Sequence, residues 1–372
     1  MGLKRRVVKK KAATSESRSS GNNYLDDIMP FIKKGTVIPI LSNSMRIDQI
    51  FREEKAMIDQ ISDTADYDDD GLTIGEELAQ VWAGEIHYPM ADNHNLARVA
   101  QFYQVEQKES LLAKTKYLKF LTNYLLDINM EEEGYQAVVR QMRTQEAFFS
   151  EIVQQLDYPR FPQGIEDPLR ILAKLPLKIF VTTSYYNFIE RALEAENKRP
   201  RTQVCFWSGG MLSAKPEHTP DPLYEPSDTE PVVYHLFGLE DYPQTLVLSE
   251  DDYMNFLISV VEDTNTQNPM VPLLLREGLA ESRLLLLGYR VRDWDFRVLF
   301  RFILKYRSIE SAPRGMLIQL TPGAQQIGNK EKSLKYLSQY FDKKQFDVDW
   351  TNPEIFIQKL WNEWDKYRKG QS

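Results

Sequence analysis

The chain of 372 residues contains a single cysteine, Cys205. One cysteine excludes an internal disulfide, and it excludes a zinc site built from several cysteines. No run of apolar residues approaches the roughly 20 residues that a helix needs to cross a bilayer. The N-terminal residues are basic and small, so they do not resemble a secretory signal. Together these absences predict a cytoplasmic protein without a membrane partner.

Histidine is scarce as well, and its positions do not suggest a metal site. The sequence has four histidines, which are His87, His94, His218 and His235. Their spacing matches none of the ligand patterns typical of zinc sites. We therefore predict that the protein holds no metal through histidine.

Charge is distributed unevenly along the chain. Residues 1–23 contain seven basic residues and one acidic residue, a net charge of +6. The whole chain carries −8, so the rest of it carries −14. An acidic body argues against a broad nucleic-acid-binding surface. A basic tail could bind a polyanion or a membrane surface, but it has nothing apolar that could dock. We therefore expect residues 1–23 to be a disordered tail and order to begin at Tyr24.

The most informative segment is a short leucine run followed by an acidic turn. Residues 284–287 are four leucines, which have no polar face and are typical of a strand covered by helices on both sides. Gly288 ends the strand, and a turn with Asp293 and Asp295 leads into a helix. Ligands of open α/β sheets bind at the carboxyl ends of such strands. The segment therefore predicts both an α/β fold and the edge of a nucleotide-sized cleft.

The rest of the chain alternates between candidate strands and helices. Further short apolar runs predict strands at residues 36–41, 177–183, 204–207, 232–237, 245–248, 316–320 and 346–350. This alternation indicates a doubly wound, mostly parallel, Rossmann-like sheet. Residues 72–157 instead show apolar residues three and four apart with no strand candidate, which predicts an inserted helical lobe. The nucleotide-fold body would then comprise residues 24–71 and 158–372.

Four short blocks at predicted strand ends resemble one family in their order. The blocks are Ser42-Asn43-Ser44, Thr182-Thr183-Ser184-Tyr185-Tyr186, Leu236-Phe237-Gly238 with the later residues 247–253, and Leu287-Gly288-Tyr289 with Asp293, Asp295 and Phe296. Together they resemble the sirtuin-like family found in bacterial anti-phage defence proteins. The resemblance spans about residues 30–365.

This resemblance implies a cleft for NAD between the sheet and the inserted helical lobe. Active members hydrolyse NAD to nicotinamide and ADP-ribose, commonly as defence effectors. The resemblance implies that NAD or ADP-ribose is bound by Ser42, Asn43, Ser44, Thr182, Thr183, Tyr185, Gly238, Gly288, Tyr289 and Asp293. An adenine nucleotide is thus one expected partner, and a second copy of the chain or another defence protein is the other.

Departures from the family pattern affect the residues that would carry catalysis. The family uses an Asn to hold the ribose and water, and a His as general base. Here the Asn position is Ser184, the following Asp position is Tyr186 and the His position is Phe237. Phenylalanine cannot take a proton, and serine lacks the paired donor and acceptor of an amide. The sequence therefore predicts that hydrolysis is lost or strongly reduced, leaving a sensor or scaffold role.

The turn after the first strand departs from the family pattern too. Its glycines are replaced by Ser42 and Ser44, whose side chains restrict the approach of a pyrophosphate although their hydroxyls could bind phosphate. Asn43 tolerates a left-handed conformation better than most residues. We expect weaker nucleotide binding than in the glycine-containing relatives.

His235 leaves an active enzyme open as an alternative. It precedes Phe237 by two residues, and strand side chains at i and i+2 share a face about 6–7 Å apart. His235 could therefore face the same cleft and act as a displaced base beside Ser184. The other interpretation is a half-buried strand histidine with an ordinary hydrogen bond, and we favour it.

A calcium-binding module is a third alternative. Residues 66–77 place acids at positions 1, 3, 5 and 12 of a calcium loop and Gly71 at position 6, but Ile74 stands at position 9 and no second loop is present. We expect an acidic surface loop instead. Protein deacylation is the least expected activity, because that branch of the family carries a four-cysteine zinc module.

The polar residues after the leucine run also have two interpretations. Asp293 and Asp295 could form a catalytic carboxylate pair, but we expect them to shape the turn, cap the next helix and edge the nucleotide pocket. Arg297 and Arg301 are four residues apart on that helix, and we expect them to pair with acids.

Overall fold

The computed structural model describes residues 20–52, 72–208, 218, 224–263, 270–308, 310–318 and 330–370. Nearly all of the basic tail lies outside these residues, and so do residues 66–71 of the candidate calcium loop. Both therefore stay predictions. In the described part of the chain, no helix combines the length and the apolar character that crossing a membrane requires.

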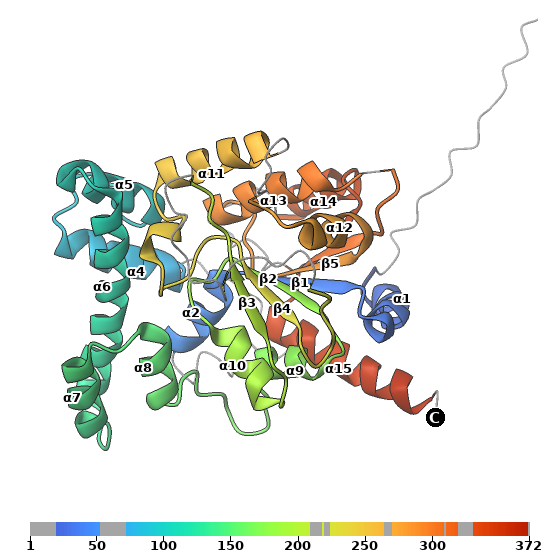
Figure 1. Cartoon of the computed structure of the whole chain (residues 1–372), viewed down its shortest axis with the longest axis horizontal. Coiled ribbons are helices and arrows are strands. Elements are labelled where there is room, and N and C mark those ends of the chain that lie inside the picture. The colour runs from blue at the N-terminus through green and yellow to red at the C-terminus, as the bar shows by residue number, and fades with distance from the viewer. Residues whose placement is uncertain are drawn as a thin grey trace, which may run out of the picture.

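A parallel sheet forms the centre of the molecule (Figure 1). Within the described residues it has seven strands in the order β3-β4-β2-β1-β5-β6-β7. The strands are β1 (Val37–Leu41), β2 (Ile179–Thr182), β3 (Arg201–Val204), β4 (Val232–His235), β5 (Arg283–Leu287), β6 (Gly315–Ile318) and β7 (Phe346–Asp349). All neighbours pair in parallel, with Ile40 opposite Val181 on one side and Leu286 on the other. The doubly wound α/β prediction is confirmed.

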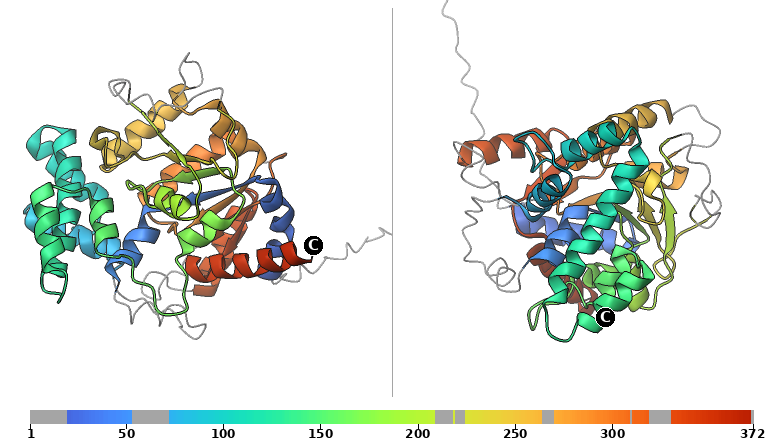
Figure 2. Two further views of the ribbon diagram at one scale, coloured as in Figure 1. Left: turned by 60° about the horizontal axis from the view of Figure 1, so that its bottom comes forward. Right: turned by 90° about the vertical axis from the view of Figure 1, so that its left-hand side faces the viewer.

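Helices cover both faces of this sheet (Figures 1 and 2). One face carries α9 (Pro168–Lys174), α10 (Phe188–Ala195) and α15 (Pro353–Lys369), with α1 (Ser20–Lys34) packed against α15. The opposite side carries α11 (Glu250–Glu262), α12 (Leu273–Glu281), α13 (Trp294–Tyr306) and α14 (Lys330–Asp342). The four leucines of residues 284–287 are fully buried between the two layers, which explains why β5 has no polar face.

Residues 72–157 are described throughout and contain helices without a strand. The helices are α4 (Ile74–Glu85), α5 (Leu96–Gln107), α6 (Ser110–Met130), α7 (Gln136–Gln145) and α8 (Phe149–Gln155). They lie together beside the carboxyl edge of the sheet (Figure 1), and we call them the helical lobe. Trp82 is buried at its centre, with its ring 5.1 Å from that of Tyr117. A buried ion pair of 3.0 Å between Lys114 and Asp252 joins the lobe to α11.

Two strand predictions were wrong. Residues 245–248 form no strand: Pro243–Thr245 is a 3₁₀ turn, and Val247 N donates only to Phe237 O at 3.0 Å. The segment is apolar because it packs beneath the loop after β4. The strand predicted at residues 204–207 instead occupies 201–204, at the edge of the sheet. An edge strand contacts only one neighbour, so its polar residues are tolerated and an apolar run is not required.

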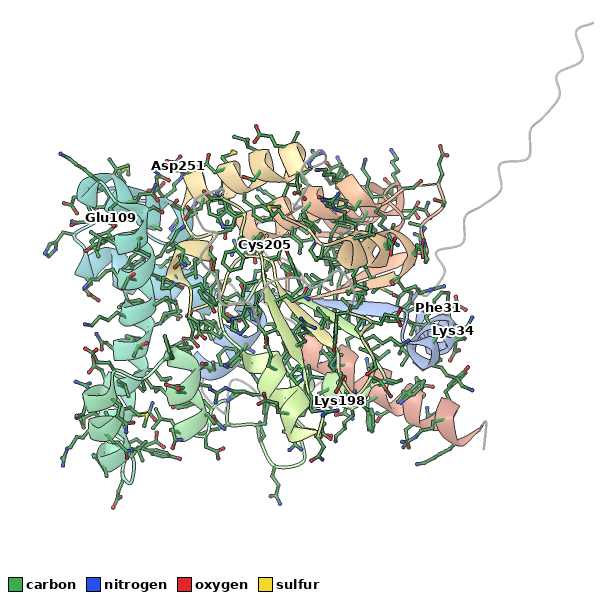
Figure 3. All side chains as sticks on the ribbon, viewed as in Figure 1. Phe31, Lys34, Glu109, Lys198, Cys205 and Asp251 are labelled. Carbon is green, nitrogen blue, oxygen red and sulfur yellow. The ribbon has the colours of Figure 1, made fainter. Side chains whose placement is uncertain are left out.

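Cys205 is fully buried at the end of β3, in the interior of the body (Figure 3). Burial raises the pKa of its thiol to about 12. The thiol therefore stays protonated at neutral pH, and Cys205 serves packing rather than nucleophilic chemistry.

Candidate functional site

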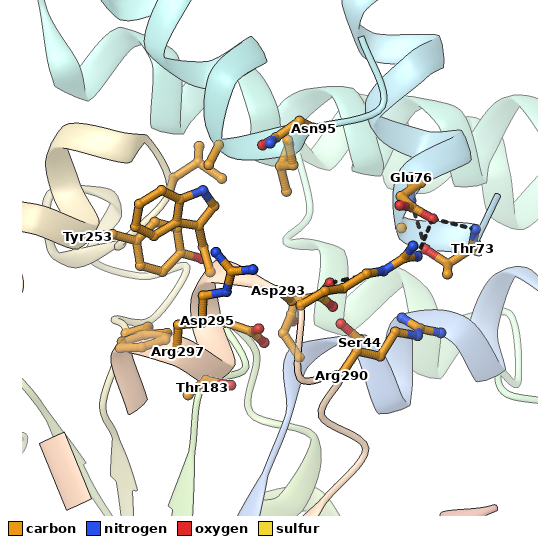
Figure 4. Close-up of a pocket in the computed structure, with 18 of the residues that line it drawn as sticks. Ser44, Thr73, Glu76, Asn95, Thr183, Tyr253, Arg290, Asp293, Asp295 and Arg297 are labelled. Carbon is orange, nitrogen blue, oxygen red and sulfur yellow. Dashed lines mark hydrogen bonds and ion pairs between the residues drawn. The ribbon is translucent and has the colours of Figure 1, made fainter. Parts of the chain in front are cut away.

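A cleft of about 470 Å³ lies between the carboxyl edge of the sheet and the helical lobe (Figure 4). Its floor comes from the loops that follow β1, β2, β4 and β5, and its roof from α4 and α5. The strand order reverses at β1, which has β2 on one side and β5 on the other. A crevice at this switch point is where open α/β sheets bind ligands, and the volume suits a nucleotide-sized molecule.

The β1–α2 turn brings a helix N-terminus to the cleft. Ser42 is the N-cap of α2 (Asn43–Phe51), with its Oγ accepting a hydrogen bond from Met45 N at 3.0 Å. The same hydroxyl donates to Gly288 O at 2.7 Å, so it joins β1 to β5 and does not face the cavity. Asn43 and Ser44 line the cleft instead. The first amides of α2 lack partners within the helix, and such groups favour an anion.

Two glycines near the cleft are required by the backbone. Gly288 has a φ of +77°, and a Cβ there would come within 2.7 Å of Ser42 Oγ. Gly238 has a φ of +95°, and a Cβ there would come within 2.5 Å of the backbone of Thr245. Both shape turns and neither lines the cavity.

Some polar residues at the end of β2 and in the loop that follows it line the cleft, and others lie in the interior. Thr183 lines the cleft, and its Oγ1 lies 3.1 Å from the hydroxyl of Tyr289, which also donates to Leu41 O at 3.0 Å. Tyr185 lines the cleft with its hydroxyl fixed to Val247 O at 2.8 Å.

The neighbouring residues of this loop do not line the cleft. Thr182 Oγ1 accepts from Ser184 N at 2.9 Å, and Ser184 Oγ accepts from Tyr186 N at 3.3 Å. The side chain of Ser184 lies in a small separate cavity behind the turn.

His235 and Phe237 occupy different surroundings, so His235 does not face the cleft as the alternative interpretation required; it is hydrogen-bonded, as the favoured interpretation expected, but fully rather than half buried. Phe237 lines the cleft and packs edge-on against Tyr253, with ring centroids 5.7 Å apart. His235 is fully buried, with Nε2 2.7 Å from Glu190 Oε1 and Nδ1 3.0 Å from Ser184 O. The strand ends at His235 and the chain then turns, so the alternation of side chains does not continue to Phe237.

Burial alone would lower the pKa of His235, but the carboxylate of Glu190 and its hydrogen bond raise that pKa above its ordinary value. The imidazole and Glu190 therefore form a buried hydrogen-bonded pair that holds β4 to α10, and the pair is an ion pair when the imidazole is protonated. The imidazole has no access to a ligand in the cleft.

Two carboxyls at the start of α13 lie in the cleft. Burial, and then the neighbouring charge of Asp293, raise the pKa of Asp295 to about 7. Asp295 Oδ1 also accepts from Phe296 N at 2.6 Å. Burial raises the pKa of Asp293 as well, although the neighbouring charges of Arg290 and Arg292 lower it. Of its side-chain surface, 33% is exposed. Asp295 is thus a cleft-lining group that exchanges its proton near neutral pH.

The cleft also has four arginines against three acidic side chains. The arginines are Arg98, Arg290, Arg292 and Arg297, and the acids are Glu76, Asp293 and Asp295. The arginines thus outnumber the acids among the lining residues, although Arg98, Arg290 and Arg292 also pair with carboxylates. Such a cavity attracts an anion although the whole chain is acidic.

Aromatic rings form one wall of the cavity. Trp294 stacks on Tyr253 with centroids 6.1 Å apart and an interplanar angle of 18°. Both residues line the cleft, and Tyr253 is labelled in Figure 4. A flat ring pair beside arginines is suited to a ligand that combines a base with phosphate.

The structure brings together half of the residues predicted to bind a cofactor. Asn43, Ser44, Thr183, Tyr185 and Asp293 line the cleft. The others support these residues from behind, and they are Ser42, Thr182, Gly238, Gly288 and Tyr289. The two catalytic candidates, Ser184 and His235, do not line it.

Several cleft residues carried no sequence signal. Glu76, Asn95 and Arg98 come from the lobe, and no local pattern shows which face of an inserted helix meets the sheet. Trp294 could have been found, because it directly follows the turn after the leucine run.

Comparison with known proteins gives one family. Residues 178–342 match the family model of the SIR2-like domain. The match extends from β2 to α14 and includes the loops that supply Thr183, Phe237 and the residues 290–297 to the cleft. No curated protein matches the chain. The match identifies residues 178–342 as a SIR2-like domain and so places this part of the chain in the sirtuin-like family.

Proposed function

We propose that the cleft binds NAD or ADP-ribose and that NAD hydrolysis is lost or strongly reduced. The protein would then act as a nucleotide sensor or scaffold in an anti-phage defence assembly of a prokaryote. The family match supports a NAD-binding fold, and the defence role is supported by the resemblance of the strand-end blocks. The expected protein partner is a second copy of the chain or another component of such an assembly.

The residues present fit an ADP-ribose-type ligand. The N-terminus of α2 offers amides to a pyrophosphate, and the arginines after β5 offer guanidinium groups. Asp293 can accept a ribose hydroxyl, and Tyr253 and Trp294 can stack on a base. Ser44 reduces the close approach that a glycine turn allows, so we expect the affinity to be moderate.

The main observation behind the proposed loss of hydrolysis is the position of Phe237 in the cleft. Cleavage of the nicotinamide–ribose bond requires a positioned water and a group that takes its proton. Phe237 lines the cleft at the family's histidine position, and its ring packs on Tyr253 and Phe256. Ser184, at the asparagine position, has its side chain outside the cleft. Nothing in the geometry favours the alternative enzyme that uses His235, because Glu190 and the backbone occupy both ring nitrogens.

The calcium alternative gains no observation in its favour. Within the described ranges, no group of three or more His, Cys, Asp or Glu side chains could hold a metal ion. Thr73 and Glu76 of the candidate loop form a capping box that starts α4, and Glu76 also pairs with Arg292. Residues 66–71 lie outside the described residues.

Two measurements on the purified protein test the proposal. Calorimetric titration with ADP-ribose and NAD should show saturable binding, and a fluorescent NAD analogue should show no cleavage above a protein-free control. Absence of binding would contradict the nucleotide role. Turnover would contradict the loss of hydrolysis, and D295N compared with H235Q would then show which group takes the proton.

A further inference from the structure

The arginines of the cleft differ in whether a protein carboxylate already neutralises them. Arg290 donates to Asp48 at 2.7 Å, and Arg292 donates to Glu76 at 2.9 Å. Arg98, at the rim, pairs with Asp92 and with Glu250. These three guanidinium groups already have anionic partners.

Arg297 is the exception among them. Its backbone N–H donates to Asp293 O within α13, but its side chain makes no hydrogen bond or ion pair with the part of the chain that the structure describes. The expectation that Arg297 and Arg301 pair with acids was therefore wrong. Arg297 differs from Arg301 in one respect, because Arg297 lines the cleft and Arg301 does not.

The surroundings of Arg297 indicate what its guanidinium would meet. Figure 4 shows the guanidinium beside the ring of Tyr253, directed into the cavity above Asp295. Trp294 stacks on Tyr253. Arg297 is solvent-exposed and lines the cavity, so its guanidinium is accessible to an anion that enters the cleft. An arginine without a protein partner binds that anion without first giving up an ion pair.

We propose that Arg297 is the phosphate-binding residue of the cleft, and that it holds a nucleotide whose base lies against the Tyr253–Trp294 pair. The inference rests on the proposed nucleotide-binding function and specifies how the ligand is recognised. It assigns the ligand class as a nucleoside with a 5′-phosphate or diphosphate, because the cation and the flat rings adjoin one another. A planar guanidinium can give such a phosphate two parallel N–H donors.

R297Q and R301Q form a matched pair of variants that tests this assignment. Both residues are exposed on α13, and neither side chain has a partner among the described residues. Both variants should therefore melt within about 1 °C of the wild type, since surface substitutions away from contacts change stability little. A loss of affinity can then be assigned to the ligand contact rather than to misfolding.

Calorimetry with ADP-ribose gives the first readout. R297Q should bind roughly 10- to 100-fold more weakly than the wild type, as expected for the loss of a charged hydrogen bond. R301Q should stay within about twofold of the wild type, because it leaves the cavity unchanged. Raising the salt concentration should weaken binding by the wild type more steeply than binding by R297Q.

AMP and adenosine give a second readout. The wild type should prefer AMP to adenosine, and R297Q should lose most of that preference. If the wild type binds ADP-ribose and R297Q binds it equally well, Arg297 does not hold the phosphate and only this inference fails. If R301Q loses as much affinity as R297Q, the effect is one of general charge and the inference fails as well. If the wild type does not bind ADP-ribose, the proposed function and this inference both fall.

Discussion

Replacing His235 tests whether this histidine supports the fold or could serve catalysis. In the structure His235 is fully buried, and its Nε2 lies 2.7 Å from Glu190 Oε1, whose side chain is 5% exposed. H235A would remove the imidazole and leave a buried carboxylate without its cationic partner. Thr202 Oγ1 would still donate to Glu190 at 2.9 Å, while Glu190 Oε2 has no partner even in the intact protein.

The expected loss of stability follows from these contacts. Removing one member of a buried ion pair costs about 3–5 kcal/mol of unfolding free energy, and a cavity adds to it. Thr202 keeps one hydrogen bond to the carboxylate, so we expect about 3–4 kcal/mol for H235A. H235Q retains a donor toward Glu190, and we expect about half that loss. Urea unfolding at pH 6, followed by tryptophan fluorescence and circular dichroism, measures both.

The pH dependence gives an independent check. The folded-state pKa of His235 is raised, so the ion pair stabilises the protein fully below the unfolded pKa of about 6.5. This contribution is lost as the pH rises through the folded-state pKa. The difference in stability between the wild type and H235Q should therefore shrink from pH 6 toward alkaline pH. An H235A protein that unfolds like the wild type, or that differs from it only in NAD turnover, would refute the structural role.

Three further predictions concern the cleft and its supports. Asp295 is mainly neutral below its pKa of about 7, so the cleft loses a negative charge there, and ADP-ribose should bind several-fold more tightly at pH 6 than at pH 8. Calorimetry should show that the affinity of D295N for ADP-ribose depends less on pH than that of the wild type. The same pH dependence in both proteins would argue against the titration of Asp295. S42A removes the side-chain cap of α2 and a hydrogen bond to Gly288 O, and should lower the unfolding free energy measured in urea by about 1–2 kcal/mol. S44A is the control. An equal loss of stability in S44A would contradict the assignment of Ser42 as the capping residue. G238A places a Cβ against the neighbouring backbone at a φ of +95°, and circular dichroism should show little folded protein. A melting temperature like that of the wild type would contradict the expectation that alanine is strained at this position.

Sequence reasoning succeeded where local chemistry decides the structure. The leucine run at residues 284–287 indicated a doubly covered strand, and it forms β5 in the interior of the sheet. The turn after this run was predicted to lead into a helix, and α13 begins at Trp294 with Asp293 as its N-cap residue. Both features depend on neighbours within a few residues.

It failed where burial arises from distant packing. Leu246 and Val247 are fully buried in a loop, and their apolar character was therefore mistaken for that of a strand. Neither α12 nor α14 was predicted, since Leu273–Glu281 is short and Lys330–Asp342 is mostly polar. The position of His235 required knowledge of where β4 ends, because alternation of side chains holds only within a strand.

The roof of the cleft was beyond local patterns for the same reason. Glu76 meets Arg292 across 216 residues of sequence, so their pairing follows from how the lobe sits on the sheet. That the side chain of Arg297 has no partner among the described residues likewise became visible only in the folded structure.

Chromatographic analysis of NAD incubated with the protein tests the central claim most directly. The claim is that the cleft retains a shape that holds the dinucleotide but has lost the family's catalytic pair, because Phe237 stands at the histidine position and Ser184 at the asparagine position. Under conditions where calorimetry shows NAD to be bound, we expect the dinucleotide to be recovered intact and no nicotinamide to form above the protein-free control. Repeated turnover, with nicotinamide and ADP-ribose released in equal amounts, would contradict the account.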